Sequence, residues 1–273
     1  MMMTTPKGPI EGYQQVSPTV NVTGDVATVD ANGVYYRQLN ECVRGLFADG
    51  VKTVKLTGVN GQRYIGNAVS GNDLRIEIEG VPGGDMAMFM NGPTIVTSGN
   101  AQDGVANTMN AGTVIVNGDA GDVLGYGMRG GRVFVKGDVG YRVGIHMKAF
   151  ENLVPVICCG GKARAFFGEY MAGGILVLLG RNAQFADQPL VGPFCGSGMH
   201  GGTIFLRGEV DPHDVGKECG IFTADEGDLK VLRPIVEEWC AAFGEDAEEI
   251  LATPFTKLVP VSHRPYGKLY APM

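Results

Sequence analysis

A repeat of about 20 residues runs through most of the chain and constrains its fold more than any other feature. Seven short apolar segments with β-strand composition each end in a glycine, at successive spacings of 19, 19, 19, 23, 20 and 28 residues. Such a period is typical of a solenoid, in which each coil buries its surface by stacking on its neighbours. The glycines are Gly80, Gly99, Gly118, Gly137, Gly160, Gly180 and Gly208.

A column of methionines keeps the same phase as these glycines. Each of five methionines lies nine residues before a glycine, and Met147 lies thirteen before Gly160 because that coil carries an insertion. A flexible methionine in every coil is typical of a stacked interior ladder, and we prefer this interpretation to a stripe of soft metal ligands. The residues predicted to hold the rod together are Met90, Met109, Met128, Met171 and Met199 with Gly99, Gly118, Gly137, Gly180 and Gly208.

Glycine makes up 43 of the 273 residues, about twice its usual share of ~7%. At turns it permits positive φ and lets successive coils approach closely, which a Cβ would obstruct. The excess is therefore explained without a ligand. We predict an all-β chain, a single-stranded β-helix of about seven to eight coils.

The segments on either side of the repeat are predicted to cap the open ends of the solenoid, whose unpaired strand edges would otherwise invite aggregation. The predicted division is an α/β N-terminal cap over 1–52, the β-helix over 53–208, and a helical cap with an extended arm over 209–273. In the first cap, a strand-like TVNVTG precedes a helix over 35–48. In the last, helical spacing ends at Gly244, and Pro234 predicts that this helix begins near Arg233 or kinks there. A short helix over 246–251 follows.

Composition and charge exclude several functions. The net charge of −7 argues against a nucleic-acid surface. No apolar run approaches the ~18 residues of a membrane helix, and the first residues lack the regions of a signal peptide, so we expect a cytoplasmic protein. Residues 121–131, GDVLGYGMRGG, superficially resemble a nucleotide-binding loop, but another β-type run follows where that motif needs a helix.

Cysteine and histidine give little sign of chemistry. The six cysteines form no Cys-x-x-Cys pair, and we expect them to be reduced and mostly buried. Cys195 looks the least buried and is the candidate nucleophile, although no Cys–His spacing supports catalysis. Two histidines beside ladder methionines make only a weak metal signal. We therefore predict no catalytic, cofactor-binding or metal-binding residue in this chain.

Polar residues beside the turns are candidates for an interface with other proteins. Solvation of the turns is the alternative for such residues. A loop of about nine extra residues in the 28-residue coil is a second candidate, because loops on rigid scaffolds often carry contacts. The interface candidates are Arg129, Arg142, His146, Glu169 and His200.

Several coils resemble a known family. The segments GDVLGYGMRGGRVFVKGDVG, GEYMAGGILVLLG and GSGMHGGTIFLRG resemble the glycine-repeat (GXGXG) domain at the C-terminal end of the glutamate synthase large subunit, and the tail FTKLVPVSHRPYGKLY resembles that of stand-alone versions. The resemblance implies a right-handed β-helix that braces an amidotransferase against a synthase. Flavin mononucleotide and iron–sulfur clusters would then belong to partner subunits, since this chain contains neither domain.

The resemblance predicts a non-catalytic scaffold subunit of a hetero-oligomeric, glutamate synthase-type oxidoreductase in nitrogen metabolism. Two alternatives stay open. The chain also resembles, more distantly, the β-helix subunit of formylmethanofuran dehydrogenase and of the related formyltransferase/hydrolase complex. It could otherwise be a free-standing structural homo-oligomer.

Overall fold

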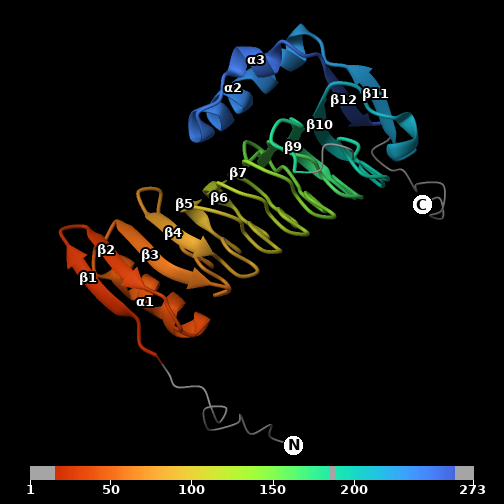
Figure 1. The fold of residues 1–273 in the computed structure, drawn as a ribbon. Helices are drawn as coiled ribbons and strands as arrows, with labels where there is room; N and C mark the ends of the chain where they lie inside the picture. Colours follow the sequence, from red (N-terminus) through yellow and green to blue (C-terminus); the bar gives the residue numbers. More distant parts are fainter. Residues whose placement is uncertain (1–15, 185–187, 262–273) are drawn as a thin grey trace, which may run out of the picture.

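The fold is a parallel β-solenoid with a cap at each end, seen in a computed structural model that describes residues 16–184 and 188–261 (Figure 1). Twelve strands form one sheet in the order β1-β2-β3-β4-β5-β6-β7-β8-β9-β10-β12-β11. Strands β2 to β10 pair in parallel, each with the next along the chain. The strands are β1 (Thr19–Thr23), β2 (Val26–Asp30), β3 (Thr53–Asn60), β4 (Arg75–Val81), β5 (Asn91–Thr97), β6 (Ala111–Val116), β7 (Arg132–Val135), β8 (Val156–Cys159), β9 (Ala172–Leu178), β10 (Gly201–Arg207), β11 (Cys219–Thr223) and β12 (Phe255–Pro260).

The predicted β-helix is confirmed, but the coil count of seven to eight is slightly too high. About six turns lie between β4 and β10. Strand β3, which we expected to open a further coil, pairs with β4 in a register that shifts between Leu56 and Val59. It also pairs with β2, to which α1 (Tyr36–Ala48) connects it, so β3 belongs equally to the N-terminal cap.

Between strands, each coil contains a stretch in which alternate residues have positive φ. In one coil these are Val123, Gly125 and Gly127, with φ of 51°, 69° and 57°. The N–H groups of Gly125 and Gly127 donate to carbonyls of the two adjacent coils, at 2.7 and 2.8 Å, while Tyr126 N–H closes a turn onto Val123 at 3.0 Å. These backbone groups are thus all paired, which sustains a conformation that costs non-glycine residues roughly 1 kcal/mol or more each.

Two of the glycines that end strands, Gly118 and Gly137, serve close stacking rather than positive φ. At Gly118 and Gly137, whose φ is not positive, an added Cβ would lie 2.1 Å from Asn100 Oδ1 and 2.0 Å from Asp119 Oδ1. These same oxygens accept backbone N–H groups of the next coil: Asn100 from Asp119 at 2.9 Å, and Asp119 from Asp138 at 2.8 Å. A ladder of short acidic and amide side chains therefore ties one edge of the coils together.

Two hydrophobic cores run side by side along the C-terminal half. The first fills the solenoid and contains the methionine ladder, in which every methionine has no exposed surface. The second lies between the outer face of β7–β10 and helix α2 (Glu226–Phe243). The chain neighbours Cys158 and Cys159 are both fully buried because Cys159 points into the first core and Cys158 into the second.

Helix α2 begins earlier than expected. It starts at Glu226 and continues through Pro234, so a start near Arg233 is wrong. Asp225 caps its first turn by accepting from Asp228 N–H, and the Asp228 side chain accepts from Asp225 N–H in return. The buried face of the helix, including Trp239 with no exposed surface, offsets the cost of the internal proline.

The rest of the C-terminal cap is folded against the last coils. The predicted short helix is α3 (Ala247–Leu251), and a 3₁₀ turn spans Pro212–Asp214. Part of the segment predicted as an extended arm is strand β12, which lies between β10 and β11 and pairs antiparallel with both. Residues 262–273 of that arm lie outside the described residues, as do 185–187 of the long loop.

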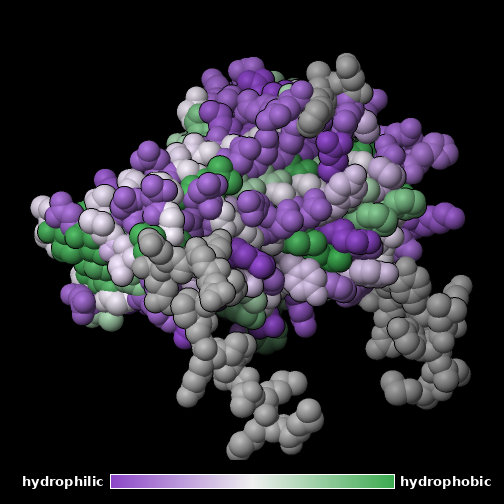
Figure 2. All heavy atoms as spheres, turned by 60° about the horizontal axis from the view of Figure 1, so that its bottom comes forward, coloured by the Kyte–Doolittle hydropathy of each residue, from purple (hydrophilic) through white to green (hydrophobic). Residues whose placement is uncertain are grey.

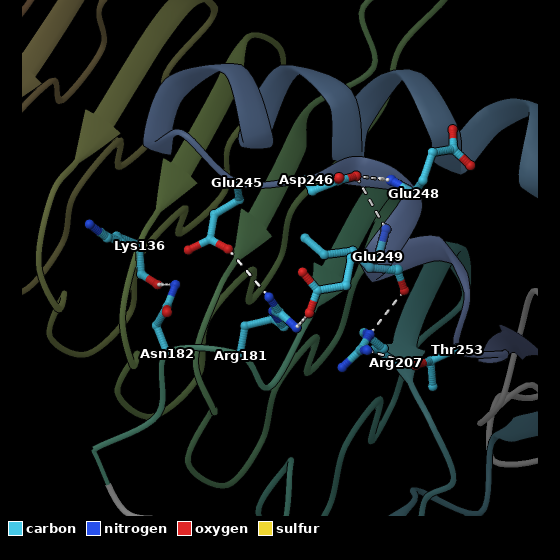
Figure 3. A network of polar contacts seen from close by, with 10 residues as sticks. Lys136, Arg181, Asn182, Arg207, Glu245, Asp246, Glu248, Glu249 and Thr253 are labelled. Carbon is cyan, nitrogen blue, oxygen red and sulfur yellow. Dashed lines mark hydrogen bonds and ion pairs between the residues drawn. The ribbon is translucent and has the colours of Figure 1, made fainter.

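A polar network fixes this cap to the long coil (Figure 3). Arg181, at the start of that coil, pairs with Glu249 at 2.6 Å and with Glu245 at 3.4 Å. One strand further on, Arg207 Nε donates to the Ile250 carbonyl at 3.0 Å. Two arginines of the solenoid therefore hold α3 and the segment before it in place.

None of the helices in the described part of the chain is long and apolar enough to cross a lipid bilayer.

Candidate functional site

The positive-φ stretches turn a set of aromatic side chains toward solvent. Equivalent residues in successive coils stack at roughly 4.8 Å, so outward side chains form columns along the rod. Five aromatic residues in these stretches or directly beside them have exposed fractions of 39–53%. They are Phe89, Tyr126, Tyr141, Tyr170 and Phe194. We call the surface formed by Tyr126, Tyr141, His146, Phe166, Tyr170 and Phe194 the aromatic face; Phe89 continues it toward the N-terminal end.

One column on this face is a stack of rings centred on His146. The His146 ring lies parallel to that of Tyr170, with a centroid distance of 5.4 Å and an interplanar angle of 10°. On its other side Tyr126 makes an edge contact at 5.9 Å. Offset and edge-on ring contacts of this kind are favourable, and they hold the three side chains in fixed positions at the surface.

A second column combines a cation with two phenyl rings. The Arg142 guanidinium lies 4.8 Å from the centroid of the Phe166 ring, and Phe166 stacks on Phe194 at 5.1 Å with an angle of 17°. Arg142 and Phe166 both have positive φ, of 57° and 66°. The backbone therefore aims these side chains in one direction from coil to coil.

An ion pair links the coils that carry the two columns. Arg142 Nε donates to Glu169 Oε2 at 2.8 Å, and the Glu169 side chain is only 10% exposed. The Glu169 carbonyl also accepts from His146 N–H at 3.1 Å. Glu169 thus contacts both columns while presenting little surface of its own.

Toward the N-terminal end the same surface becomes polar. Arg63 lies 4.9 Å from the Tyr64 ring centroid and pairs with Asp85 at 3.1 Å; Asp85 also accepts from Asn107 at 3.2 Å. A shallow groove of about 390 Å³ follows, lined by Arg63, Asp85 and Asp103 among others. Apart from Phe89 and Tyr64, the aromatic side chains described on this surface therefore lie in the coils after β6.

The structure brings three of the five sequence candidates together. Arg142, His146 and Glu169 are in contact on the aromatic face, as described above. Arg129 is exposed and lies beside Gly130, shortly before β7 begins. His200 begins the turn into β10 and is partly buried, with Nδ1 at 3.3 Å from the Gly198 carbonyl.

The aromatic partners of these residues were missed by sequence reasoning. The sequence position that could have identified them is the one directly before each ladder methionine. The residue at this position has positive φ and points outward, as at Phe89, His146 and Tyr170. The repeat period alone does not reveal this, since the phase of φ within a coil is needed to decide which side chains leave the core.

The cysteines offer no nucleophile at this surface. Cys195, expected to be the least buried, has no exposed surface, and burial raises the pKa of its thiol well above the ordinary value. Burial also raises the pKa of Cys219 to about 11. Among residues 16–184 and 188–261, no group of three histidine, cysteine or acidic side chains is placed to hold a metal ion.

The fold and this surface define a capped parallel β-solenoid in which alternate residues of each coil have positive φ between the strands. The chain belongs to the GXGXG motif family, whose sequence pattern matches residues 49–261. It is 49% identical over 250 residues to an uncharacterized protein, MJ1350, of Methanocaldococcus jannaschii, covering 89% of this chain and 96% of that protein. The GXGXG domain is typical of glutamate synthase-type proteins, in which it is a non-catalytic part.

Proposed function

We propose that this chain is a non-catalytic scaffold subunit of a cytoplasmic, multi-subunit, glutamate synthase-type oxidoreductase. In this proposal it holds an amidotransferase-like subunit against a synthase-like subunit that carries flavin mononucleotide and iron–sulfur clusters. Membership of the GXGXG family supports the type of complex.

The aromatic face is the single observation that supports docking of another protein. Tyrosine, phenylalanine and arginine side chains gather there, and such residues are enriched where protein interfaces carry their binding energy. Ring stacking and the Arg142–Glu169 ion pair already fix several of these side chains. A partner would therefore lose little side-chain freedom by binding to them.

Within this proposal the five sequence candidates have different roles. Arg142 and His146 contact the partner directly, as neighbours in the two columns. Glu169 acts through Arg142 as a positioning residue, because it is nearly buried. Arg129 and His200 lie at the margins and contribute less.

The test is an anaerobic purification of the tagged full-length chain from its native organism, followed by mass spectrometry and visible absorption. We expect flavin and iron–sulfur absorbance together with an amidotransferase-like protein. A variant with Tyr170→Glu and Phe194→Glu should lower recovery of these partners at least tenfold. Phe222→Glu is the matched control, since Phe222 is 52% exposed but lies on β11 in the C-terminal cap.

Three results would contradict the proposal or its docking surface. Recovery of amidohydrolase-like and formyltransferase-like partners would assign the chain to a formylmethanofuran dehydrogenase-type or formyltransferase/hydrolase complex. A colourless chain recovered without other subunits would leave a free-standing structural oligomer. If the Tyr170 and Phe194 variant kept all its partners, the aromatic face would not be the docking surface.

A further inference from the structure

Within the residues that the structure describes, the sheet ends at β1 in an edge that lacks the usual protection. All five residues of this strand are exposed, and Val20 and Val22 are 39% and 50% exposed. Natural edge strands are commonly protected by charged side chains, prolines or bulges, because an open edge pairs with other strands. Between Thr19 and Thr23 the sequence contains no charge, no proline and no glycine.

The sequence of this strand, Thr-Val-Asn-Val-Thr, reads the same in both directions. If two copies pair antiparallel about Asn21, every residue faces an identical or equivalent one: Thr19 faces Thr23, Val20 faces Val22, and Asn21 faces itself. Such a pairing is closed by a twofold axis, as in most homodimers. It places no like charges opposite each other, although the chain as a whole carries −7.

The backbone N–H and C=O groups of β1 that do not bond to β2 are the ones that this antiparallel pairing needs. β1 and β2 form a hairpin in which Thr23 pairs with Val26 across a two-residue turn, with positive φ at Gly24. In such hairpins the pair beside the turn is hydrogen-bonded, and bonding alternates along the strand. Thr19, Asn21 and Thr23 therefore bond to β2, while the N–H and C=O groups of Val20 and Val22 face away from the sheet.

The valine side chains make the same edge apolar on one face. Val20 lies opposite Val29 and Val22 opposite Ala27, and both of these β2 residues are fully buried. Val20 and Val22 thus extend the core face of the sheet beyond its last covered strand. Figure 2 shows hydrophobic surface gathered at the end of the molecule where Figure 1 places β1.

We infer that β1 is the pairing surface for a second copy of this chain. The two β1 strands run antiparallel about a twofold axis at Asn21, join two sheets into one, and exchange backbone hydrogen bonds between Val20 of one copy and Val22 of the other. This surface is on the N-terminal cap, separate from the aromatic face, and the inference does not depend on the proposed function.

Asn21 gives the sharpest test, because its two copies would form a non-hydrogen-bonded pair with Cβ atoms about 4.5–5.5 Å apart. Full-length Asn21→Asp and Asn21→Lys variants should each dimerise at least tenfold more weakly than wild type at pH 7, by sedimentation equilibrium. An equimolar mixture of the two variants should recover a dimer containing one copy of each. Because Asn21 is exposed, neither substitution should change the circular dichroism spectrum.

Thr28→Asp is the matched control. Thr28 faces Asn21 within the hairpin and is exposed on the same side of the sheet, but it lies one strand further from the proposed axis. The dimer of the Thr28→Asp variant should have the same dissociation constant as the wild-type dimer. The same weakening in Thr28→Asp would indicate a general charge effect and overturn the inference.

Three further outcomes would also overturn it. The full-length wild-type chain could be monomeric at all concentrations. This outcome would count against the inference even if a variant lacking residues 1–15 formed a dimer. Both Asn21 variants could stay dimeric, which would place the contact elsewhere. Their mixture could fail to form the mixed dimer.

Discussion

Arg142 Nε donates to Glu169 Oε2 at 2.8 Å across adjacent coils, and this ion pair ties the two columns of the aromatic face together. Because the carboxylate is nearly buried and the guanidinium half-exposed, its removal should cost on the order of 1 kcal/mol of unfolding free energy. We expect Glu169→Ala to show this loss in urea denaturation. Glu169→Gln keeps an acceptor of the same shape and should lose less; equal losses would mean that the acceptor is unimportant.

The methionine ladder should not accept a charge. Met128 has no exposed surface, and Met128→Asp would bury an unpaired carboxylate among apolar side chains at a cost of several kcal/mol. We expect this variant to be unfolded by circular dichroism at room temperature. Met128→Leu keeps the volume and should cost less than about 1.5 kcal/mol. A soluble Met128→Asp protein with a wild-type melting curve would refute the ladder as a source of stability.

Two strand-ending glycines should respond in opposite ways to the same substitution. A Cβ at Gly137 would lie 2.0 Å from Asp119 Oδ1, whereas a Cβ at Gly99 would meet nothing within 4 Å. Gly137→Ala should therefore lower the free energy of unfolding by about 1–3 kcal/mol, as overpacking does. Gly99→Ala should be neutral or stabilise by up to about 1 kcal/mol, because it restricts the unfolded chain. Equal effects in urea denaturation would argue against close stacking as the reason for Gly137.

The free energy of unfolding should depend on pH in the acidic range because of Asp228, at the start of α2. Burial acts to raise the pKa of Asp228, but hydrogen bonds from Lys257, at 2.6 Å, and from Asp225 N–H outweigh it and lower that pKa. A carboxyl whose pKa falls on folding contributes stability above its unfolded pKa, and this is lost as pH falls through the folded value. We expect Asp228→Asn to lower the free energy of unfolding more at pH 7 than at pH 3. A difference independent of pH would exclude this linkage.

The thiols should be unreactive while the chain is folded. Cys158, Cys159 and Cys195 are fully buried, and burial raises the pKa of each thiol, which reduces the reactive thiolate. We expect iodoacetamide at pH 8 to leave these three unmodified in the native protein and to modify all six cysteines in denaturant, as peptide mass spectrometry would report. Rapid native labelling of Cys195 would show that its coil opens.

The local pattern of the sequence accounts for the regular part of the fold. Each coil contacts only its neighbours, so the strand-ending glycines and the methionine nine residues earlier repeat once per turn and can be recognised without distant contacts. The helix α1 was likewise predicted to within one residue, because its apolar spacing and its stop at Asp49-Gly50 are local.

Only the tertiary structure decided the features that depend on distant residues. Helix α2 crosses Pro234 because the buried face of that helix packs on β7–β10, while β12 enters the sheet between β10 and β11 by pairing with strands up to about 50 residues earlier. The neighbours Cys158 and Cys159 are both buried because two cores meet at β8. The aromatic face also required the fold: the period of the repeat fixes how far apart coils begin, but the sign of φ at each position, set by hydrogen bonds between coils, decides which side chains point to solvent.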